Sequence, residues 1–268
     1  MEQTILKKEY ALVTGATGGV GKAFANVLAE EGYSLILTGR SEEKLSQLKE
    51  ELSQKFGTDC IAYAADLSNG QDREAFFEQI QKEKASISFL ANVAGADIQK
   101  AFSNYTQEKI SFQCRVNFES AVSTCLFAIE NRAETLHIVN ISSVSGIYPM
   151  PYFAIYSATK GALTSFSLSL REEMKGKNVN VTAILPGAMP TREDIKEQIK
   201  GQGLWGRLAA KSPESVAYAS IKAVRKNKGK VIVGFWNKIM RISTFWIPAP
   251  LKRKFIAKRW SKISKDAF

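Results

Sequence analysis

Three side chains in the middle of the chain have types and spacing that could do chemistry together. Tyr156 and Lys160 are four residues apart, which places them on one face of a helix. A free phenol has a pKa of about 10 and is a poor base at neutral pH, but a neighbouring ammonium group favours the phenolate and lowers that pKa. Ser143 could donate a hydrogen bond to a carbonyl oxygen as negative charge develops on it. A lone Tyr-x-x-x-Lys pair is common and usually structural, but Ser143 and a glycine turn further upstream favour the chemical interpretation. On that interpretation, Tyr156 donates and accepts a proton beside a hydride transfer.

A glycine-rich turn near the N-terminus predicts where a cofactor binds. Residues 14–21 read Thr-Gly-Ala-Thr-Gly-Gly-Val-Gly and directly follow an apolar run. A tight turn of this kind exposes backbone N–H groups at the start of a helix, where the helix dipole favours a pyrophosphate. Such turns also simply connect a strand to a helix, so this feature alone leaves both interpretations open. The residues predicted to contact the cofactor here are Gly15, Thr17, Gly18, Gly19, Val20 and Gly21.

The residues after the second apolar run indicate which nicotinamide cofactor is preferred. An acidic residue at this place would accept hydrogen bonds from the ribose hydroxyls of NAD and would repel a 2′-phosphate. The chain has Arg40 and Ser41 instead, which can make a charge-assisted contact and a hydrogen bond to a phosphate. The alternative is a solvated arginine at the start of a helix whose first turn holds Glu42 and Glu43. We expect NADP(H) rather than NAD(H).

Two further loops could line the same cofactor. Asp66 and Leu67 follow the third apolar run, and the carboxylate of Asp66 could accept a hydrogen bond from the adenine amino group. Asn92, Ala94 and Gly95 follow the fourth, and small residues there would let a flat ring or a ribose lie against the backbone. Each loop could equally be a helix cap or a turn.

Short apolar runs alternate with longer amphipathic segments and predict the elements that position these residues. The strands are expected at 10–14, 34–38, 60–64, 89–92, 136–141, 180–185 and 231–233. The helices are expected near 19–31, 42–56, 71–83 and 152–175, with another inside 106–130. Continuous apolar strands indicate that both faces of the sheet are covered, and strand–helix alternation indicates a parallel, doubly wound sheet. Ligands bind such sheets beyond the carboxyl ends of the strands, which is where the residues above fall.

These motifs together resemble the short-chain dehydrogenase/reductase family. The residues that carry the resemblance are Thr14-Gly-x-x-x-Gly-x-Gly21, Asn92-Val-Ala-Gly95, Asn117, Ser143 and Tyr156-x-x-x-Lys160. The pattern covers residues 10 to about 191 with its order and spacing intact. The resemblance implies an α/β fold, namely a three-layer α/β/α Rossmann-like doubly wound sheet of seven parallel strands. It also implies hydride transfer between NAD(P) and a carbonyl or an alcohol.

The resemblance assigns a role to each matching residue. Tyr156 resembles the catalytic acid and base, and Lys160 resembles the residue that holds the nicotinamide ribose and tunes that tyrosine. Ser143 matches the hydroxyl that orients the substrate, and Asn117 matches the residue that holds a water in a proton relay. The segment after the sixth strand would also contact the cofactor, through Pro186, Gly187 and Thr191.

Two positions depart from the family pattern. Val93 replaces a common asparagine, and Gly18 stands where NADP-preferring members often have a basic residue. Arg40 matches the NADP-preferring branch, so recognition of the phosphate would rest more heavily on Arg40 alone.

The composition excludes several classes of protein. Of the 268 residues, 45% are hydrophobic and 24% are charged, which suits one globular α/β domain. The single histidine, His137, rules out a three-histidine metal site, and we expect it to be structural. Cys60, Cys114 and Cys125 are too scattered for a disulfide framework or a zinc site. Cys114 and Cys125, eleven residues apart on one predicted helix, are expected to pack on one face.

The chain shows no signal peptide and no uninterrupted apolar run long enough to span a bilayer. We therefore expect a cytoplasmic protein. Because oligomers are common in the family, the resemblance also implies a homodimer or a homotetramer.

The net charge of +11 belongs to the C-terminal end of the chain. Residues 225–268 carry 13 Lys or Arg against one acid, whereas the other 224 residues carry 24 basic and 25 acidic side chains. We divide the chain into an NADP-binding domain, residues 1–234, and a basic, aromatic-rich helical tail, residues 235–268, packed on or near the substrate site. Lys252 and Arg259 interrupt the apolar stripe of the tail, which favours a helix over the substrate site or against a neighbouring subunit. Peripheral contact with an anionic membrane is the alternative, and nucleic acid is not an expected partner because no reading motif accompanies the charge.

Residues around the predicted substrate site suggest what it binds. The segment 188–208, with Trp205, stands where this family keeps a mobile lid. Tyr148, Met150, Tyr152 and Phe153 fall on the loop facing it, where they would line an apolar pocket or pack in the core. We predict an oxidoreductase that transfers a hydride between NADPH and a small-to-medium, lipophilic carbonyl or alcohol. The alternative is a non-catalytic NADP-binding sensor or scaffold docked through its basic tail.

Overall fold

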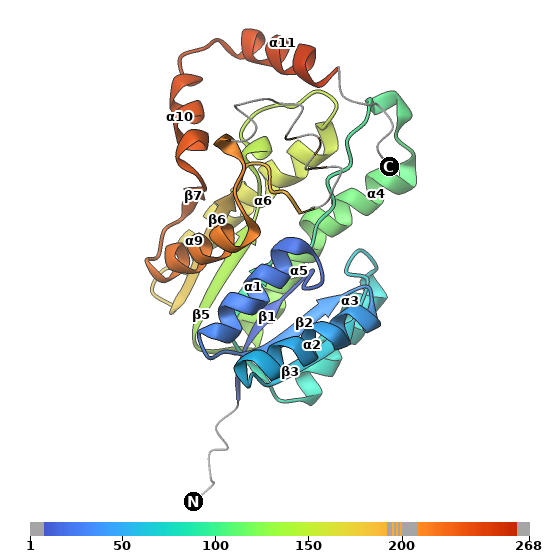
Figure 1. Ribbon diagram of the computed structural model, residues 1–268, viewed down its shortest axis with the longest axis vertical. Helices are drawn as coiled ribbons and strands as arrows, with labels where there is room; N and C mark the ends of the chain where they lie inside the picture. Colours follow the sequence, from blue (N-terminus) through green and yellow to red (C-terminus); the bar gives the residue numbers. More distant parts are fainter. Residues whose placement is uncertain (1–7, 192–194, 196, 198, 200–207, 262–268) are drawn as a thin grey trace, which may run out of the picture.

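Seven parallel strands form one sheet in the part of the chain that the computed structural model describes, residues 8–191, 195, 197, 199 and 208–261. Their order is β3-β2-β1-β4-β5-β6-β7, so the direction in which the sheet grows reverses between β1 and β4 (Figure 1). The strands are β1 Glu9–Val13, β2 Ser34–Gly39, β3 Cys60–Ala64, β4 Ser86–Asn92, β5 Arg132–Ile141, β6 Val179–Leu185 and β7 Lys230–Ile232. All six neighbouring pairs are parallel, as the alternation of strands and helices predicts.

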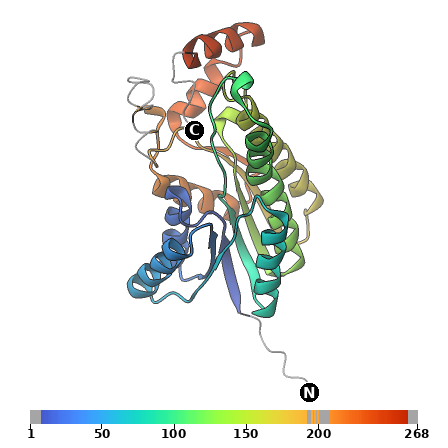
Figure 2. The same ribbon diagram turned by 90° about the vertical axis from the view of Figure 1, so that its right-hand side faces the viewer.

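Helices cover both faces of this sheet and make a three-layer molecule (Figure 2). The helices that share one buried apolar cluster are α1 (Gly19–Glu30), α2 (Glu42–Phe56) and α9 (Pro213–Arg225). Those that share a second cluster, on the other face, are α3 (Gly70–Lys82), α5 (Ser120–Glu130) and α6 (Ala154–Glu173). The predicted three-layer α/β/α fold with a doubly wound parallel sheet is confirmed.

The middle of β2 is apolar because both of its faces are buried. In β2, Leu35 and Leu37 pack in the first cluster and Ile36 packs in the second. All three side chains are completely inaccessible to solvent. Burial of a side chain of this size contributes roughly 1.5–3 kcal/mol relative to its exposure, so the sheet centre is a main source of stability.

The helical segment expected inside residues 106–130 is interrupted. α4 (Gln107–Cys114) is followed by a π-helical turn, Arg115–Glu119, before α5 begins. A π turn holds more residues than an α-helical turn, so it rotates the residues that follow it relative to those before it. Cys114 is exposed while Cys125 is buried, and the prediction that these cysteines share one face is wrong for this reason.

A helix that the sequence pattern did not place connects β6 to β7. α9 begins after Ser212, whose side chain accepts a hydrogen bond from the Ser215 N–H, and Pro213 opens the first turn. Beyond β7 the tail forms α10 (Phe235–Ser243) and α11 (Ala249–Trp260), which lie at the opposite end of the molecule from α2 (Figure 1). Across the described residues, no helix combines the length and the apolar character needed to cross a membrane.

Candidate active site

The turn after β1 is locked against the loop after β4. The Thr14 hydroxyl oxygen accepts hydrogen bonds from the N–H groups of Val93 (3.0 Å) and Ala94 (3.1 Å). Gly15 has a φ of +62°, and a Cβ on it would lie 2.9 Å from the Cα of Ala94. Glycine fits this position because the backbone is left-handed and a second chain segment approaches closely. Gly15 and Ala94 are therefore neighbours at the point where the strand order reverses.

α1 begins with an open, positively polarised end. Gly18 and Gly19 are exposed, no side chain caps the helix, and its first turn holds no acidic residue. A Cβ on Gly21 would lie 2.0 Å from the carbonyl oxygen of the first glycine in the turn, so only glycine lets the turn close. Val20 packs on the first apolar cluster, and Thr191 lies over the turn, with its Cγ2 2.9 Å from where a Cβ on Gly19 would be. A helix N-terminus with free N–H groups is suited to hold a phosphate.

The end of β2 lies beside this turn. Thr17 Oγ1 is 3.0 Å from where a Cβ on Gly39 would be, so the two segments are in contact. Arg40 is exposed and forms no ion pair with any other residue that the structure describes. Ser41 caps α2, since its hydroxyl oxygen accepts a hydrogen bond from the Lys44 N–H (3.3 Å). The Ser41 hydroxyl proton stays available, so both Arg40 and Ser41 can donate to a phosphate beyond β2.

Three of the predicted cofactor residues have side chains engaged elsewhere. Oδ1 of Asp66 accepts hydrogen bonds from the N–H (2.9 Å) and the hydroxyl (2.7 Å) of Ser68, which closes a local turn. Leu67 is buried in the second apolar cluster. The buried Asn92 side chain donates a hydrogen bond to Asn140 Oδ1 (2.8 Å) within the sheet. Asn92 can therefore face a cofactor only with its backbone.

Ser143 lies on a turn that packs directly on α6. The turn, Val144–Gly146, follows β5, and a Cβ on Gly146 would lie 2.7 Å from the backbone N of Gly161. The Ser143 hydroxyl oxygen accepts a hydrogen bond from the Ser145 N–H (3.1 Å). Its side chain also forms a hydrogen bond with that of Tyr156. The turn thus places Ser143 next to the phenol.

Tyr156 and Lys160 occupy the first two turns of α6. The Nζ of Lys160 lies 5.9 Å from the centre of the Tyr156 ring. The lysine is almost fully buried, and its Nζ donates a hydrogen bond to the Ile141 carbonyl (2.8 Å) at the end of β5. This bond ties the start of α6 to the carboxyl end of the sheet and fixes the position of the amine.

Asn117 joins the same group from the π-helical turn. Its Oδ1 accepts a hydrogen bond from the Ala96 N–H (2.7 Å), and its Nδ2 donates to the Ala96 carbonyl (2.9 Å) and to Thr159 Oγ1 (3.2 Å). A Cβ on Gly95 would lie 3.0 Å from Asn117 Oδ1 and 3.3 Å from Lys160 Nζ. Gly95, Asn117 and Lys160 are therefore in contact, with no room for a side chain between them.

The pKa of Tyr156 is not lowered by Lys160, contrary to the sequence-based expectation. Part of the tyrosine surface stays accessible, yet burial of the phenol raises its pKa to about 12, and the negative charge of Asp97 acts in the same direction. The hydrogen bond with Ser143 opposes this shift. Burial also lowers the pKa of Lys160 to about 8, against the attraction of Asp97. Tyr156 is therefore protonated at neutral pH, which suits it to donate a proton.

Asp97 is a charged group that the sequence motifs did not reveal. It follows Gly95 by two residues, and its charge acts on both Tyr156 and Lys160. Its position just beyond the carboxyl end of β4 was the available signal, because that edge of the sheet carries the other site residues.

The segment after β6 is held between the Ser143 turn and the tail. The Pro186 carbonyl accepts a hydrogen bond from the Val144 N–H (3.0 Å). A Cβ on Gly187 would lie 2.6 Å from Nδ2 of Asn237, a buried side chain of α10. Asn237 Nδ2 in turn donates hydrogen bonds to the carbonyls of Ala209 (3.0 Å) and Val233 (2.7 Å). The sequence motifs missed this residue, which connects the tail to the predicted cofactor segment.

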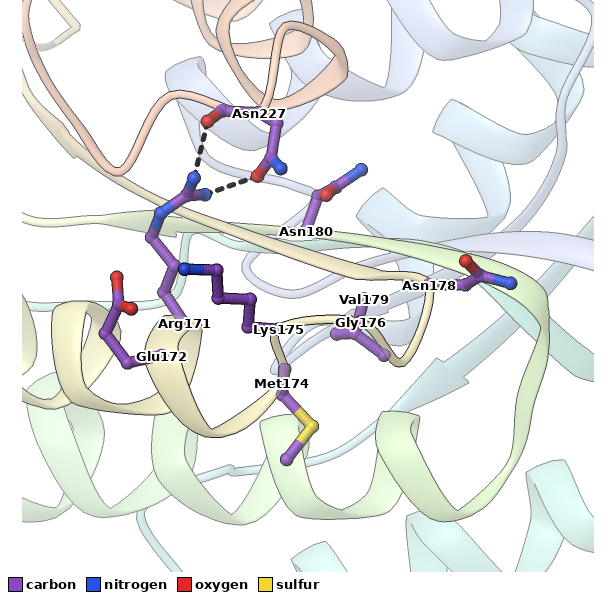
Figure 3. Close-up of a pocket in the computed structure, with 9 residues that line it drawn as sticks. All are labelled: Arg171, Glu172, Met174, Lys175, Gly176, Asn178, Val179, Asn180 and Asn227. Carbon is purple, nitrogen blue, oxygen red and sulfur yellow. Dashed lines mark hydrogen bonds between the residues drawn. The ribbon is translucent and has the colours of Figure 1, made fainter.

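Two hollows have linings that do not include these residues. One, of about 310 Å³, lies at the opposite end of α6 from Tyr156, where the Arg171 guanidinium donates hydrogen bonds to Asn227 (Figure 3). The other, of about 500 Å³, is lined by the loop 146–151 and by the start of α6, and includes Tyr148 and Met150. None of the predicted cofactor or catalytic residues lines either hollow. Most of the expected lid, including Trp205, lies outside the described residues.

Comparisons with known proteins agree with this geometry. The short chain dehydrogenase family profile matches residues 9–200. The oxidoreductase YvrD of Bacillus subtilis is 39% identical over 198 residues, which cover 73% of this chain and 74% of that protein. The very-long-chain 3-oxoacyl-CoA reductase of Bos taurus is 33% identical over 192 residues, which cover 69% of this chain and 60% of that protein. The crystal structure of L-sorbose reductase from Gluconobacter frateurii, in complex with NADPH and L-sorbose, gives a TM-score of 0.76 at 25% identity over 85% of this chain and 95% of that one.

The sheet order, the glycine turn and the residues around Tyr156 define a Rossmann-like oxidoreductase. The chain belongs to the short-chain dehydrogenase/reductase family. It is an oxidoreductase of the type that uses a nicotinamide cofactor and acts on alcohol or carbonyl groups.

Proposed function

We propose that this protein is an NADP(H)-dependent carbonyl reductase or alcohol dehydrogenase in which Tyr156 exchanges a proton with the substrate oxygen. The observation that supports this most directly is the convergence of four polar residues from three separate segments. Lys160 contacts Gly95 beside Asn117, and Ser143 hydrogen-bonds the Tyr156 side chain. Four polar residues with only a structural role would not need to place a phenol at the edge of the sheet where ligands bind.

The residues around the first two strands fit the cofactor. The glycines of the first turn leave a cradle that a Cβ would fill, and the uncapped start of α1 would hold the pyrophosphate. Arg40 is exposed and not engaged by another described residue, so it would bind the 2′-phosphate of NADP. L-sorbose reductase, solved with NADPH, supports this preference by similarity.

The proton would move as follows. When bound, the reduced nicotinamide supplies a hydride to the carbonyl carbon. The hydroxyls of Ser143 and Tyr156 would hydrogen-bond the carbonyl oxygen, and Tyr156 would give it a proton as negative charge develops there, leaving an alcohol and a phenolate. Asn117 would hold a water through which solvent returns the proton to Tyr156. Lys160 would hold the nicotinamide ribose, and in alcohol oxidation each step runs in reverse.

A lipophilic substrate fits the loop beside the site. Tyr148 and Met150 line an open hollow with other mainly apolar groups, and Phe153 packs against the Tyr156 ring with 5.8 Å between the ring centres. The bovine relative is named as a reductase of very-long-chain 3-oxoacyl-CoA, a substrate with a long apolar chain. We propose a small-to-medium, lipophilic carbonyl compound or alcohol as the substrate.

Turnover of a carbonyl panel with NADPH by a Tyr156→Phe variant tests this proposal. The variant should lose at least about a hundredfold in kcat, the lower end of typical acid–base contributions, while it still binds NADPH with unchanged affinity. Tyr63→Phe is the matched control, because that phenol donates a hydrogen bond to Glu83 (3.0 Å) well away from α6. Undiminished turnover in Tyr156→Phe would rule out the mechanism.

A second candidate is a non-catalytic NADP-binding sensor or scaffold docked through its tail. The observation that favours it is the exposed basic surface of α10 and α11. It predicts tight NADPH binding without reduction of any carbonyl in the panel.

We also propose that the chain forms a homodimer or a homotetramer and acts in the cytoplasm. Light scattering on the purified chain tests the oligomeric state.

A further inference from the structure

The tail helices carry most of the large apolar side chains that this structure leaves exposed. Among the described residues, eight of the eleven exposed large hydrophobic side chains fall within residues 235–255. Trp246, in the turn between α10 and α11, is 84% exposed. Clustered apolar exposure of this kind marks an interaction surface rather than ordinary surface composition. We call the following residues the tail surface: Ile242, Phe245, Trp246, Ile247, Leu251 and Phe255.

The charge around the tail surface is of one sign. Residues 235–261 contain no acidic residue. Their seven basic residues are Lys238, Arg241, Lys252, Arg253, Lys254, Lys258 and Arg259. The rest of the chain up to residue 224 is close to neutral, so this charge is local. Arg241 and Lys252 lie over the Tyr148 ring, and the other five basic side chains are exposed. An occupant must therefore be apolar enough to accept a tryptophan and anionic enough to pair with exposed basic side chains, which describes an anionic lipid bilayer.

The opposite side of the tail contacts the loop next to Tyr156. The Tyr148 hydroxyl lies 2.7 Å from Thr244 Oγ1, and the Trp260 ring packs edge-on against Phe153 with 4.9 Å between the ring centres. Phe153 in turn packs against Tyr156. The tail thus has one side fixed to the active-site loop and one side exposed, and Figure 1 shows both helices at the end of the molecule that lies beyond the start of α6.

We propose that the tail surface binds an anionic lipid bilayer and so holds the active-site loop 148–153, on the other side of the tail, close to the bilayer. Trp246 and its apolar neighbours insert at the headgroup boundary, and the surrounding lysines and arginines pair with lipid phosphates. Carbonyl compounds dissolved in the bilayer are then concentrated near the loop 148–153. The substrate part of this inference rests on the proposed function, whereas the docking part does not.

Cosedimentation of the full chain with vesicles tests the docking. We expect the protein to bind vesicles of phosphatidylglycerol and phosphatidylcholine in equal parts. Binding to pure phosphatidylcholine should be much weaker, and binding to the anionic vesicles should weaken with added salt, because surface charges are screened within roughly a Debye length. No binding to the anionic vesicles would overturn the proposal.

Paired variants test whether the apolar side chains of the tail surface bind the vesicles, rather than exposed apolar side chains anywhere on the molecule. Phe245→Ser with Leu251→Ser should weaken vesicle binding at least about tenfold, since each removes an apolar side chain that the bilayer would bury. The matched control is Phe102→Ser with Leu126→Ser, because those side chains are 62% and 59% exposed, against 61% and 59% for Phe245 and Leu251. Equal losses in both pairs would contradict a specific surface.

Charge reversal gives an independent measurement. Arg253→Glu with Lys254→Glu should weaken binding to anionic vesicles at least about 25-fold, from roughly fivefold per basic residue near the lipid. Lys49→Glu with Lys55→Glu on α2 is the control, since both lysines are exposed at the far end of the molecule. An unchanged affinity of the tail pair would contradict the proposal.

The remaining outcomes distinguish a second copy of this chain from a bilayer as the occupant of the tail surface. They also distinguish the docking proposal from the proposed function. A dimer in light scattering that Trp246→Ser dissociates, with no vesicle binding, would assign the tail surface to a second copy of this chain instead. Tyr156→Phe should bind vesicles as the unmodified chain does, because it removes only a proton donor. The tail-surface variants should reduce a water-soluble carbonyl at an unchanged rate without vesicles, so loss of docking and loss of chemistry are separable.

Discussion

The residues around Tyr156 and the residues of the tail surface are held in opposite ways. Asn117 and Lys160 are almost fully buried, and each is tied to backbone groups of a neighbouring segment. Trp246 and Leu251 are exposed, in the turn after α10 and on α11. In the first region a side chain serves folding and chemistry at once, so substitution should disturb both. In the second region folding makes little use of the side chains, which leaves them free for a partner.

Asn117→Ala should have the largest effect on stability. It leaves the Ala96 N–H unpaired and removes one hydrogen bond each from the Ala96 carbonyl and from Thr159 Oγ1. The carbonyl keeps its bond from Gln113 Nε2, and Thr159 keeps its bond to the Tyr156 carbonyl. An unpaired N–H costs about 1–3 kcal/mol and each of the other lost hydrogen bonds about 0.5–1.5 kcal/mol, so we expect a loss of about 2–6 kcal/mol in the free energy of unfolding, with a fall in turnover. Urea unfolding measures the first quantity. Asn26→Ala, which loses one exposed hydrogen bond to the Lys22 carbonyl, should change stability by less than about 0.5 kcal/mol.

The rate should depend on pH in only one of the two directions of the reaction. Tyr156 has a pKa of about 12 and Lys160 one of about 8, so at neutral pH the phenol is protonated and the amine is still charged. Reduction needs the phenol and should be nearly constant between about pH 6 and pH 8, whereas oxidation needs the phenolate and should rise about tenfold per pH unit. The measurement is kcat/KM in each direction, with hydride transfer limiting. An oxidation rate equal at both ends of this range would exclude Tyr156 as the base.

Arg40→Asp should change cofactor choice more than stability, because Arg40 is exposed. Loss of a charged contact to the 2′-phosphate should weaken NADPH binding by about 1.5–3 kcal/mol, roughly 10- to 150-fold, with little change for NADH. Titration of protein fluorescence with each cofactor measures both affinities. The control is Arg132→Asp, an exposed arginine at the start of β5, away from the carboxyl edge of the sheet. Equal effects on NADPH and NADH would contradict the assignment of Arg40.

Local spacing predicted those features that depend on neighbours in the chain. The helix over 42–56 and the strand over 60–64 have the bounds that the sequence pattern gave, because each is set by a short periodic run between clear end signals. The spacing of Tyr156 and Lys160 placed both in the first turns of α6 for the same reason. α9 was missed although Ser212 and Pro213 form a recognisable helix start.

Features that depend on distant segments could not be predicted in this way. The π turn that separates Cys114 from Cys125 leaves no periodic signal, so the shared face was wrongly expected. The pKa of Tyr156 depends on how much protein surrounds the phenol and on Asp97, a residue 59 positions earlier. Asn237 contacts Gly187 across 50 residues of sequence. In each case the chain segments must be packed before the effect exists.

Trp246→Ser should have the smallest effect on folding and so gives the sharpest contrast with Asn117. The side chain is 84% exposed, so its removal should change the free energy of unfolding by less than about 0.5 kcal/mol. Asn237→Ala provides the matched comparison within the same tail, because it removes the donor to the Ala209 and Val233 carbonyls and should cost about 1 kcal/mol. Urea unfolding of both variants decides the point. A Trp246→Ser protein as destabilised as Asn237→Ala would show that the exposed side of the tail contributes to the fold, and the separation of the two regions would then be lost.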